Sequence, residues 1–306
     1  ELEITNDLIF ASDDMNIFNS LDSNLQLLFR NVNTYGDLSS IYKDDKDYKL
    51  LSSILYNIKY PLIKISENNR SFLTPILSLR YSPNKGLNLK NNENLISFQD
   101  LFVIDRIDNN TVEHGLSTTL GLEYKKIDTF ASENIKLGLA VNLRDKEDKD
   151  LPISSSLGEK TSDIIGYSGI NISKNISIQY DFSLDQNLNE TNYSLLSTKY
   201  KGGKFNTSFE YMEKSKHIGD ESYLTNLTEF NLNESNSIGF ETNKNLDKNL
   251  TNYYNLIYEY KNDCLEASLV YNKQFYENNS LNSGKNIFFK ISLKPFGTIN
   301  TPSIND

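Results

Sequence analysis

The chain has 306 residues, of which 38% are hydrophobic, and its mean hydropathy is -0.51. No run approaches the ~18 consecutive apolar residues of a transmembrane helix, which excludes a helical membrane protein. A net charge of -10 argues against nucleic-acid binding through a basic surface. The composition is compatible with a soluble protein. It is also compatible with a β-barrel membrane protein, because only alternate residues of a barrel strand face lipid.

In chain order, the alternation of apolar and polar residues predicts about fifteen antiparallel strands and no convincing helix. For example, Ile135, Leu137 and Leu139 alternate with Lys136 and Gly138. The runs have about nine to thirteen residues, near the ~9–11 of a transmembrane strand and above the ~5–6 of a soluble one. We expect the strands near 1–12, 23–35, 49–64, 71–82, 114–127, 133–145, 162–173, 175–185, 191–202, 204–214, 223–233, 236–246, 251–261, 264–276 and 284–294.

The connections between these strands alternate between tight turns and long polar segments. The turns lie at 201–204, 233–235 and 261–263, and the long segments at 83–113, 146–161 and 215–222. Tight periplasmic turns and long extracellular loops are typical of outer-membrane barrels. Segment 83–113 also carries apolar residues between Leu95 and Ile104, so we expect it to fold over or into the barrel.

Candidate catalytic and metal-binding residues are sparse. His114 and His217 lie beside polar loops, away from any nucleophile, metal-ligand or phosphate-loop pattern. The charged run 144–150 lacks the Gly and terminal Glu of a calcium loop, so a solvated charge run is the preferred interpretation. We therefore predict a protein that is not an enzyme, with no cofactor and no metal site.

Cys264 is the only cysteine of the chain and stands at the start of a predicted strand, on its polar side with Glu266 and Ser268. Two interpretations stay open, an inert free thiol and one half of a disulfide with a partner upstream. The chain begins at Glu1 without a Met or a basic leader, which we interpret as the start of a fragment.

Three stretches of the sequence carry short motifs. The first lies on the long segment and is here called the folded-loop motif, with Asp100, Leu101, Phe102, Asp105, Arg106, Glu113 and Gly115. The second stretch is 151–166, and the third comprises 258–264 and 291–297. In their order and spacing these stretches resemble the C-terminal barrel of the LptD family of lipopolysaccharide-assembly proteins, especially its alphaproteobacterial branch. The resemblance covers roughly residues 50–306.

The resemblance implies a transmembrane β-barrel of the ~26-strand class, of which about fifteen strands form the C-terminal part. Residues 1–306 would then be one barrel domain in the bacterial outer membrane, without the N-terminal periplasmic domain. The implied function is transport of lipopolysaccharide into the outer leaflet, in contact with outer-membrane lipids. The implied partners are an LptE-like lipoprotein plug and a periplasmic LptA-like bridge that meets the missing domain. Cys264 matches the C-terminal disulfide cysteine of the family.

In that family the barrel opens at a seam between its first and last strands, and the last predicted strand, 284–294, would be one side of it. Pro295 cannot donate a ladder hydrogen bond, so pairing there should be weak. One alternative is a general porin or nutrient transporter with the same fold. Another is a soluble adhesin or carbohydrate-binding β-sandwich, whose strands should be shorter. The seam residues that we single out are Ile287, Phe289, Ile291, Leu293 and Pro295.

Overall fold

The computed structural model shows strands that expose their apolar side chains and bury many of their polar ones. On β7 (Gly115–Asp128), Leu120 and Leu122 are 45% and 43% exposed, whereas Ser117 and Thr119 are 2% and 3% exposed. A soluble antiparallel sheet buries its apolar face, so this pattern is the reverse of a soluble sandwich. Strands that face lipid on one side and a polar interior on the other show the observed arrangement.

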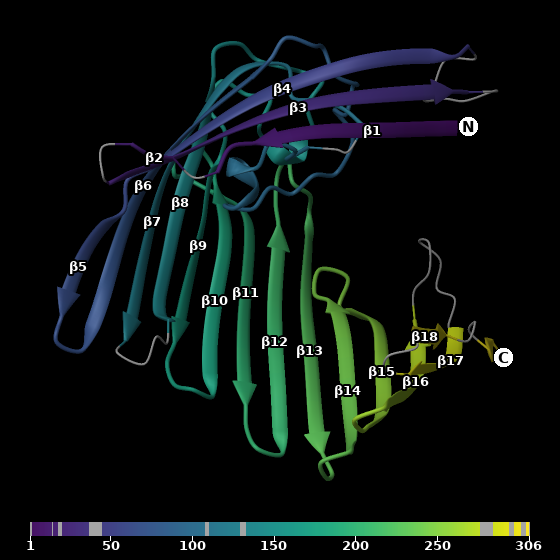
Figure 1. Ribbon diagram of the computed structural model, residues 1–306. Coiled ribbons are helices and arrows are strands. Elements are labelled where there is room, and N and C mark those ends of the chain that lie inside the picture. The colour runs from purple at the N-terminus through teal and green to yellow at the C-terminus, as the bar shows by residue number, and fades with distance from the viewer. Residues whose placement is uncertain are drawn as a thin grey trace. The chain divides into compact units, whose positions relative to one another are not determined.

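The structure describes residues 2–13, 15–17, 20–36, 45–107, 110–128, 133–275, 284–293, 297–300 and 304–305. Within them no helix is long and apolar enough to cross a membrane. By internal contacts the chain divides into two units, whose strands are labelled in Figure 1. Unit 1 comprises 1–168, 181–192 and 216–219, and unit 2 comprises 169–180, 193–215 and 220–306.

Unit 1 is built on antiparallel strands that follow one another along the chain. The strand pairs are β1–β3, β3–β4, β4–β6, β5–β6, β6–β7 and β7–β8, and the short β2 pairs with the start of β3. The strands are β1 (Leu2–Ala11), β2 (Met15–Ile17), β3 (Leu21–Tyr35), β4 (Asp47–Lys59), β5 (Leu62–Ser66), β6 (Asn69–Ser82), β7, β8 (Glu133–Arg144) and the first part of β9 (Ile164–Asn171). Two 3-10 turns, η1 (Asp100–Phe102) and η2 (Ile153–Ser155), lie in the long connections.

Unit 2 is a meander of consecutive antiparallel hairpins from β11 to β17, while β10 (Ile176–Leu184) is divided between the units. The short β18 (Gly297–Asn300) and β19 (Ile304–Asn305) both pair with β17. The meander contains β11 (Thr191–Lys201), β12 (Phe205–Lys214), β13 (Glu221–Asn231), β14 (Asn236–Asn245), β15 (Leu250–Lys261), β16 (Leu265–Gln274) and β17 (Gly284–Leu293).

The predicted all-β antiparallel fold is confirmed, and every predicted strand has a counterpart. The predicted strand 49–64 is the one that differs in kind, because it is interrupted at Tyr60 and Pro61 into β4 and β5. Pro61 has no N–H to place in a ladder. Pro75 of β6 accepts a hydrogen bond from Tyr60 N–H through its carbonyl but has no N–H to return. The short strands β2, β18 and β19 are additional to the prediction.

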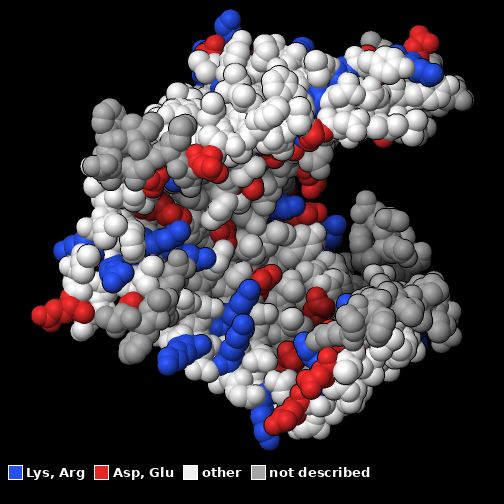
Figure 2. All heavy atoms as spheres, viewed as in Figure 1, with Lys and Arg blue, Asp and Glu red and all other residues white. Residues whose placement is uncertain are grey.

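One face of the unit 1 sheet is covered by the long connections 83–113 and 146–163. Two buried clusters form there, one around Leu101 with Phe98 and Ala140, the other around Ile104 with Leu28. We call the covered side the inner face and the other side the outer face. The outer face carries exposed apolar side chains, and Figure 2 shows β1, β3 and β4 as a mostly uncharged surface with charges near the strand ends.

Candidate functional site

The long connection 83–113 is folded onto the inner face as predicted, and glycines of the sheet make room for a ring of the connection and for a tyrosine ring that contacts it. A Cβ atom added at Gly121 of β7 would lie 2.5 Å from the Phe102 ring. At Gly138 of β8 an added Cβ would lie 2.3 Å from the Tyr167 ring, whose centroid is 5.1 Å from that of Phe98. Phe102 of the loop therefore packs directly on the backbone at Gly121, and Tyr167 of the sheet, which contacts Phe98 of the loop, packs on the backbone at Gly138.

A single buried carboxylate, Glu113, holds the end of this loop in place. It accepts hydrogen bonds from Arg106 Nε at 2.7 Å and Arg106 Nη2 at 2.8 Å, and from Ser117 Oγ at 2.9 Å. Arg144 also donates to it, and Arg80 Nε lies 3.5 Å from its Oε2. Burial opposes ionisation of Glu113, but the charges of the three arginines and the Arg106 hydrogen bonds outweigh it and lower its pKa to about 2.

The three arginines around Glu113 come from different elements and join the loop to the sheet. Arg106 of the loop donates to Leu101 O at 3.1 Å and to Asn142 Oδ1 of β8 at 2.9 Å. Arg80 of β6 donates to the carbonyls of Val103 and Ile104. Buried charges are tolerated only when their donors are satisfied in this way.

A second buried arginine contact fixes the other side of the loop. Arg30 of β3 is fully buried and binds two carboxylates, Asp7 of β1 at 2.7 and 2.8 Å and Asp105 of the loop at 2.7 and 3.1 Å. It also donates to Thr111 O at 2.6 Å. The fork of one guanidinium therefore links β1, β3 and the loop, a geometry that lysine cannot reproduce.

The connection 146–163 ends at Asp163, which joins it to the β12–β13 connection. Asp163 accepts hydrogen bonds from Ser183 Oγ at 2.8 Å and Asn192 Nδ2 at 3.0 Å, and His217 Nε2 lies 3.1 Å away. Burial of Asp163 opposes its ionisation, but these hydrogen bonds lower its pKa. The contact with Asp163 raises the pKa of His217 against the effect of burial.

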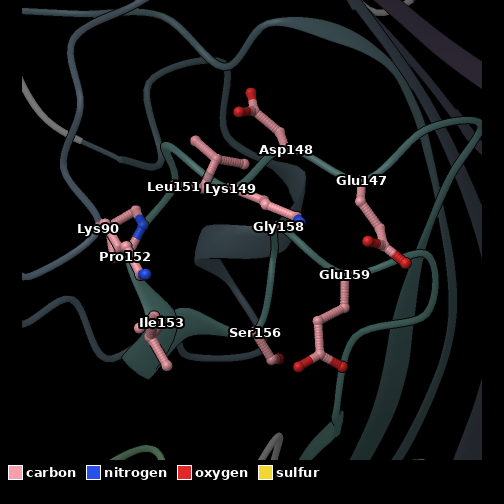
Figure 3. A pocket seen from close by; sticks show the side chains of 10 residues that line it. All are labelled: Lys90, Glu147, Asp148, Lys149, Leu151, Pro152, Ile153, Ser156, Gly158 and Glu159. Atoms are coloured by element: carbon pink, nitrogen blue, oxygen red, sulfur yellow. The ribbon is translucent and has the colours of Figure 1, made fainter.

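A small pocket of about 170 Å³ lies on the connection 146–163 (Figure 3). Glu147 and Glu159 stand on one side of it, and Lys90 and Pro152 on the other. Burial raises the pKa of Glu159. In the described part of the chain, no cluster of three or more His, Cys, Asp or Glu side chains is arranged to hold a metal ion.

The structure brings most of the folded-loop motif together. Leu101 and Phe102 pack on the sheet, and Asp105, Arg106 and Glu113 form the buried ion pairs. The two remaining positions are local. The backbone N–H and the hydroxyl of Ser97 both donate hydrogen bonds to the Asp100 carboxylate, and Gly115 begins β7 with φ of 87°.

The other predicted site residues lie in unit 2. Cys264 is exposed at the turn before β16. Ile287, Phe289 and Leu293 of β17 are 40–46% exposed, and Ile291, on the same strand, pairs with Ala267 of β16. Pro295 lies outside the described residues. The roles predicted for these positions stay predictions.

Sequence reasoning missed Arg30, Arg80 and Arg144, although a signal was present. The chain has five arginines, and the remaining two are Arg70 and Arg106. Four of the five are buried against the loop, whereas no lysine is among the buried residues of the described part of the chain. For Arg80 and Arg144 the available clue was an arginine at the same strand parity as small polar residues, Ser78 and Ser82 on β6 and Asn142 on β8.

The sequence model of the LptD family, described as LPS transport system D, matches residues 38–250, which include the folded loop, Glu113 with its three arginines, and Asp163, but not Arg30. This chain belongs to the LptD family. The match ends before Cys264 and before β17. Membership in the LptD family supports a role in lipopolysaccharide transport at the bacterial outer membrane, and the family is one of transport proteins and not of enzymes.

No curated protein matches the chain. Among solved structures, two mutants of the Rh. blastica porin match with TM-scores of 0.42 and 0.41 at 7% and 8% identity, each covering 96% of this chain and 93% of the porin. A third porin mutant matches with a TM-score of 0.36 at 8% identity, covering 97% of this chain and 98% of the porin. Scores this low carry no argument about fold or function.

Proposed function

We propose that this chain forms part of the barrel of a lipopolysaccharide translocon, which moves the glycolipid into the outer leaflet of the outer membrane. The observation that carries the proposal is the match to the LptD family over a region whose sheet exposes apolar residues outward and buries polar residues inward. An apolar outer face suits contact with outer-membrane lipids. In this proposal the short turns lie in the periplasm and the long connections on the cell surface.

A polar lining suited to sugar hydroxyls is present on one face of unit 2. Glu241 accepts hydrogen bonds from Tyr253 Oη at 3.0 Å and Asn255 Nδ2 at 2.7 Å, and Asn272 Nδ2 donates to Asn255 Oδ1 at 2.6 Å. Asn243 Nδ2 donates to Thr225 Oγ1 at 2.8 Å on the same face. Amide and hydroxyl groups of this kind can form hydrogen bonds to a passing saccharide in the same way that they form hydrogen bonds to ordered water.

The folded loop has a structural part in the proposed route. Its arginine–carboxylate contacts are buried, so it is a fixed part of the interior and not a gate that opens with each substrate. Movement is assigned instead to the seam at β17, which pairs with β16 on one side and with only the short β18 and β19 among the described strands on the other. An LptE-like lipoprotein in the lumen, an LptA-like bridge on the periplasmic side and a disulfide from Cys264 to a segment upstream complete the proposal.

Depletion of the full-length protein in its own bacterium tests the function. The proposal predicts that newly made lipopolysaccharide is retained in the periplasm and that surface labelling of lipopolysaccharide falls. Uptake of small hydrophilic solutes should be unchanged, which separates the translocon from a general porin. Normal surface lipopolysaccharide after depletion would refute the proposal. For the seam, a covalent crosslink between β17 and the first strand that leaves transport intact would refute that part alone.

A further inference from the structure

The β5–β6 hairpin has a strand edge without a neighbour in the described part of the chain. The register of β4 against β6 continues through the interruption at Pro61 into β5, from Lys59↔Ile76 to Leu62↔Leu73. On the opposite side, β3 begins at Leu21 and its pairing with β4 ends at Lys59. The five residues of β5 therefore extend beyond the strand that would have covered them.

The hydrogen-bonding parity of β5 shows which groups face this open edge. Tyr60 N–H donates to Pro75 O at 3.1 Å. Because hydrogen-bonded positions alternate along an antiparallel strand, the even-numbered residues of β5 direct their backbone N–H and C=O groups toward β6. A two-residue connection between Ser66 and Asn69 gives the same parity. Ile63 and Ile65 therefore point their backbone N–H and C=O groups away from β6, into the open edge.

The inner-face side chains beside this edge are apolar and, unlike those under the long connections, exposed. Ile63 and Ile65 are paired with Phe72 and Arg70 of β6, and cross-strand partners share a face. That face is the inner one, because Ile76 has the same parity on β6 and is buried there. Ile63 is 58% exposed and Ile65 is 74% exposed, whereas the apolar inner-face residues Leu28, Leu55 and Ile76 are buried. Exposed apolar groups next to free backbone donors favour strand addition.

A cleft of about 410 Å³ adjoins the edge and is lined by Ile65, Arg70, Phe72 and Ile127, with Glu67 and Asp128 at its turn end. It could hold a side chain of an added strand on the inner side of the sheet. Arg70 forms no ion pair with the described residues, so it is available to a carboxylate beside that side chain. An added strand would thus carry an apolar residue over the cleft and an acidic residue near Arg70.

We propose that the edge of β5 binds an extended segment of a partner protein by β-strand addition, with its apolar side chains in the cleft beside Ile65 and a carboxylate on Arg70. This inference rests on the proposed function only for placing the β5–β6 turn in the periplasm. The partner segment would continue the sheet where β3 stops and would cover the Ile63 and Ile65 side chains.

The test uses the full-length protein in its own bacterium, with a photo-crosslinking benzoylphenylalanine at position 63. We expect a crosslink to one protein, mapped by mass spectrometry to an extended segment with alternating apolar residues. Ile65→Pro removes an outward N–H without touching the hydrogen bonds to β6, and proline is tolerated on edge strands. This variant should reduce the crosslink about three- to ten-fold, the effect of one backbone hydrogen bond. Ile65→Val keeps the N–H and should leave the yield near wild type.

Arg70→Gln should also lower the yield, whereas Lys64→Gln, a change on the outer side of the same hairpin, should not. Equal yields from Ile65→Pro and wild type would overturn strand addition. A crosslink to lipid alone, or to a second copy of this chain, would overturn the partner assignment. Surface lipopolysaccharide is measured in parallel in cells depleted of the protein. Unchanged surface lipopolysaccharide there contradicts the proposed function, while an absent crosslink with impaired export contradicts only this inference.

Discussion

Replacing Glu113 with glutamine removes one negative charge from the centre of the loop attachment while keeping the size of the side chain. The carboxylate is 4% exposed and receives two hydrogen bonds from Arg106, at 2.7 and 2.8 Å, together with contacts from Arg80 and Arg144. Glutamine can accept some of these bonds, but its amide nitrogen is itself a donor and would face guanidinium groups. The three arginines would be left buried without their shared counter-charge.

The expected cost follows from the burial of the group. Breaking a buried ion pair by removing one partner destabilises by about 3–5 kcal/mol, because the remaining charge is left uncompensated. An opening equilibrium of the loop that changes by about 3 kcal/mol changes by roughly 150-fold. The variant should therefore fold its strands but release the connection 83–113 from the inner face.

Limited trypsin digestion of the purified full-length protein in detergent measures this release, through cleavage after Lys85 and Lys90. We expect the Glu113→Gln variant to be cut about 100-fold faster when cleavage follows local opening. Glu147→Gln, a change of an exposed acid in the neighbouring connection 146–163, is the control and should digest as wild type. Wild-type resistance in the Glu113→Gln variant would refute the idea that this charge holds the loop.

Acid should reproduce the effect in the wild-type protein, because the pKa of Glu113 is lowered from 4.5 to about 2 in the folded chain. A lowered pKa contributes stability above the unfolded value, and that stability is lost as the pH falls through the folded value. Digestion with pepsin should thus show a protected loop near pH 4.5 that opens as the pH approaches about 2. Opening already complete above pH 5 would contradict the assignment.

Other contacts give smaller or differently directed effects. Asp105→Asn weakens one of two carboxylate contacts of Arg30 and should cost about 1.5–3 kcal/mol in the same trypsin assay; a loss as large as that of the buried glutamate would contradict the shared arrangement. The pKa of His217 is raised from 6.5, so its contact stabilises the β12–β13 connection below that pH and is lost as the pH rises through the folded pKa. Protease cutting of that connection should increase from pH 6 to pH 9, and Asp163→Asn should abolish the pH dependence; a dependence that survives would exclude the pair as its source. Gly121→Ala places a Cβ 2.5 Å from an aromatic ring of the loop, so we expect a loss of about 1–3 kcal/mol in loop protection, and an unchanged rate would show that the ring can move freely.

The strands were predictable from sequence because period-two alternation is local and is the direct consequence of one apolar and one polar face. The alternation of Ile135, Leu137 and Leu139 with Lys136 and Gly138 becomes the outer and inner faces of β8. Residues 49–64 kept this pattern through Pro61, so sequence alone did not separate β4 from β5. The break depends on which residues must supply a backbone N–H to a neighbouring strand, and the alternation of side chains does not show this.

The folded loop was also predictable, because a polar connection with its own apolar residues needs a surface to bury them. The contacts that attach the loop to the sheet were not predictable from the sequence. Arg144 lies 31 positions from Glu113, and Arg30 lies 75 positions from Asp105, so no local spacing joins them. Only the paired register of β3, β6 and β8 brings these arginines to one face.

The most direct test of the central claim is the fate of newly made lipopolysaccharide in cells depleted of the full-length protein. Pulse-labelled lipopolysaccharide is followed from the inner membrane to the cell surface by surface-specific labelling. We predict that the labelled lipid stops before the surface and that re-expression of the wild-type protein restores its arrival. Undiminished arrival of lipopolysaccharide at the surface of depleted cells would contradict the assignment of this chain to lipopolysaccharide transport.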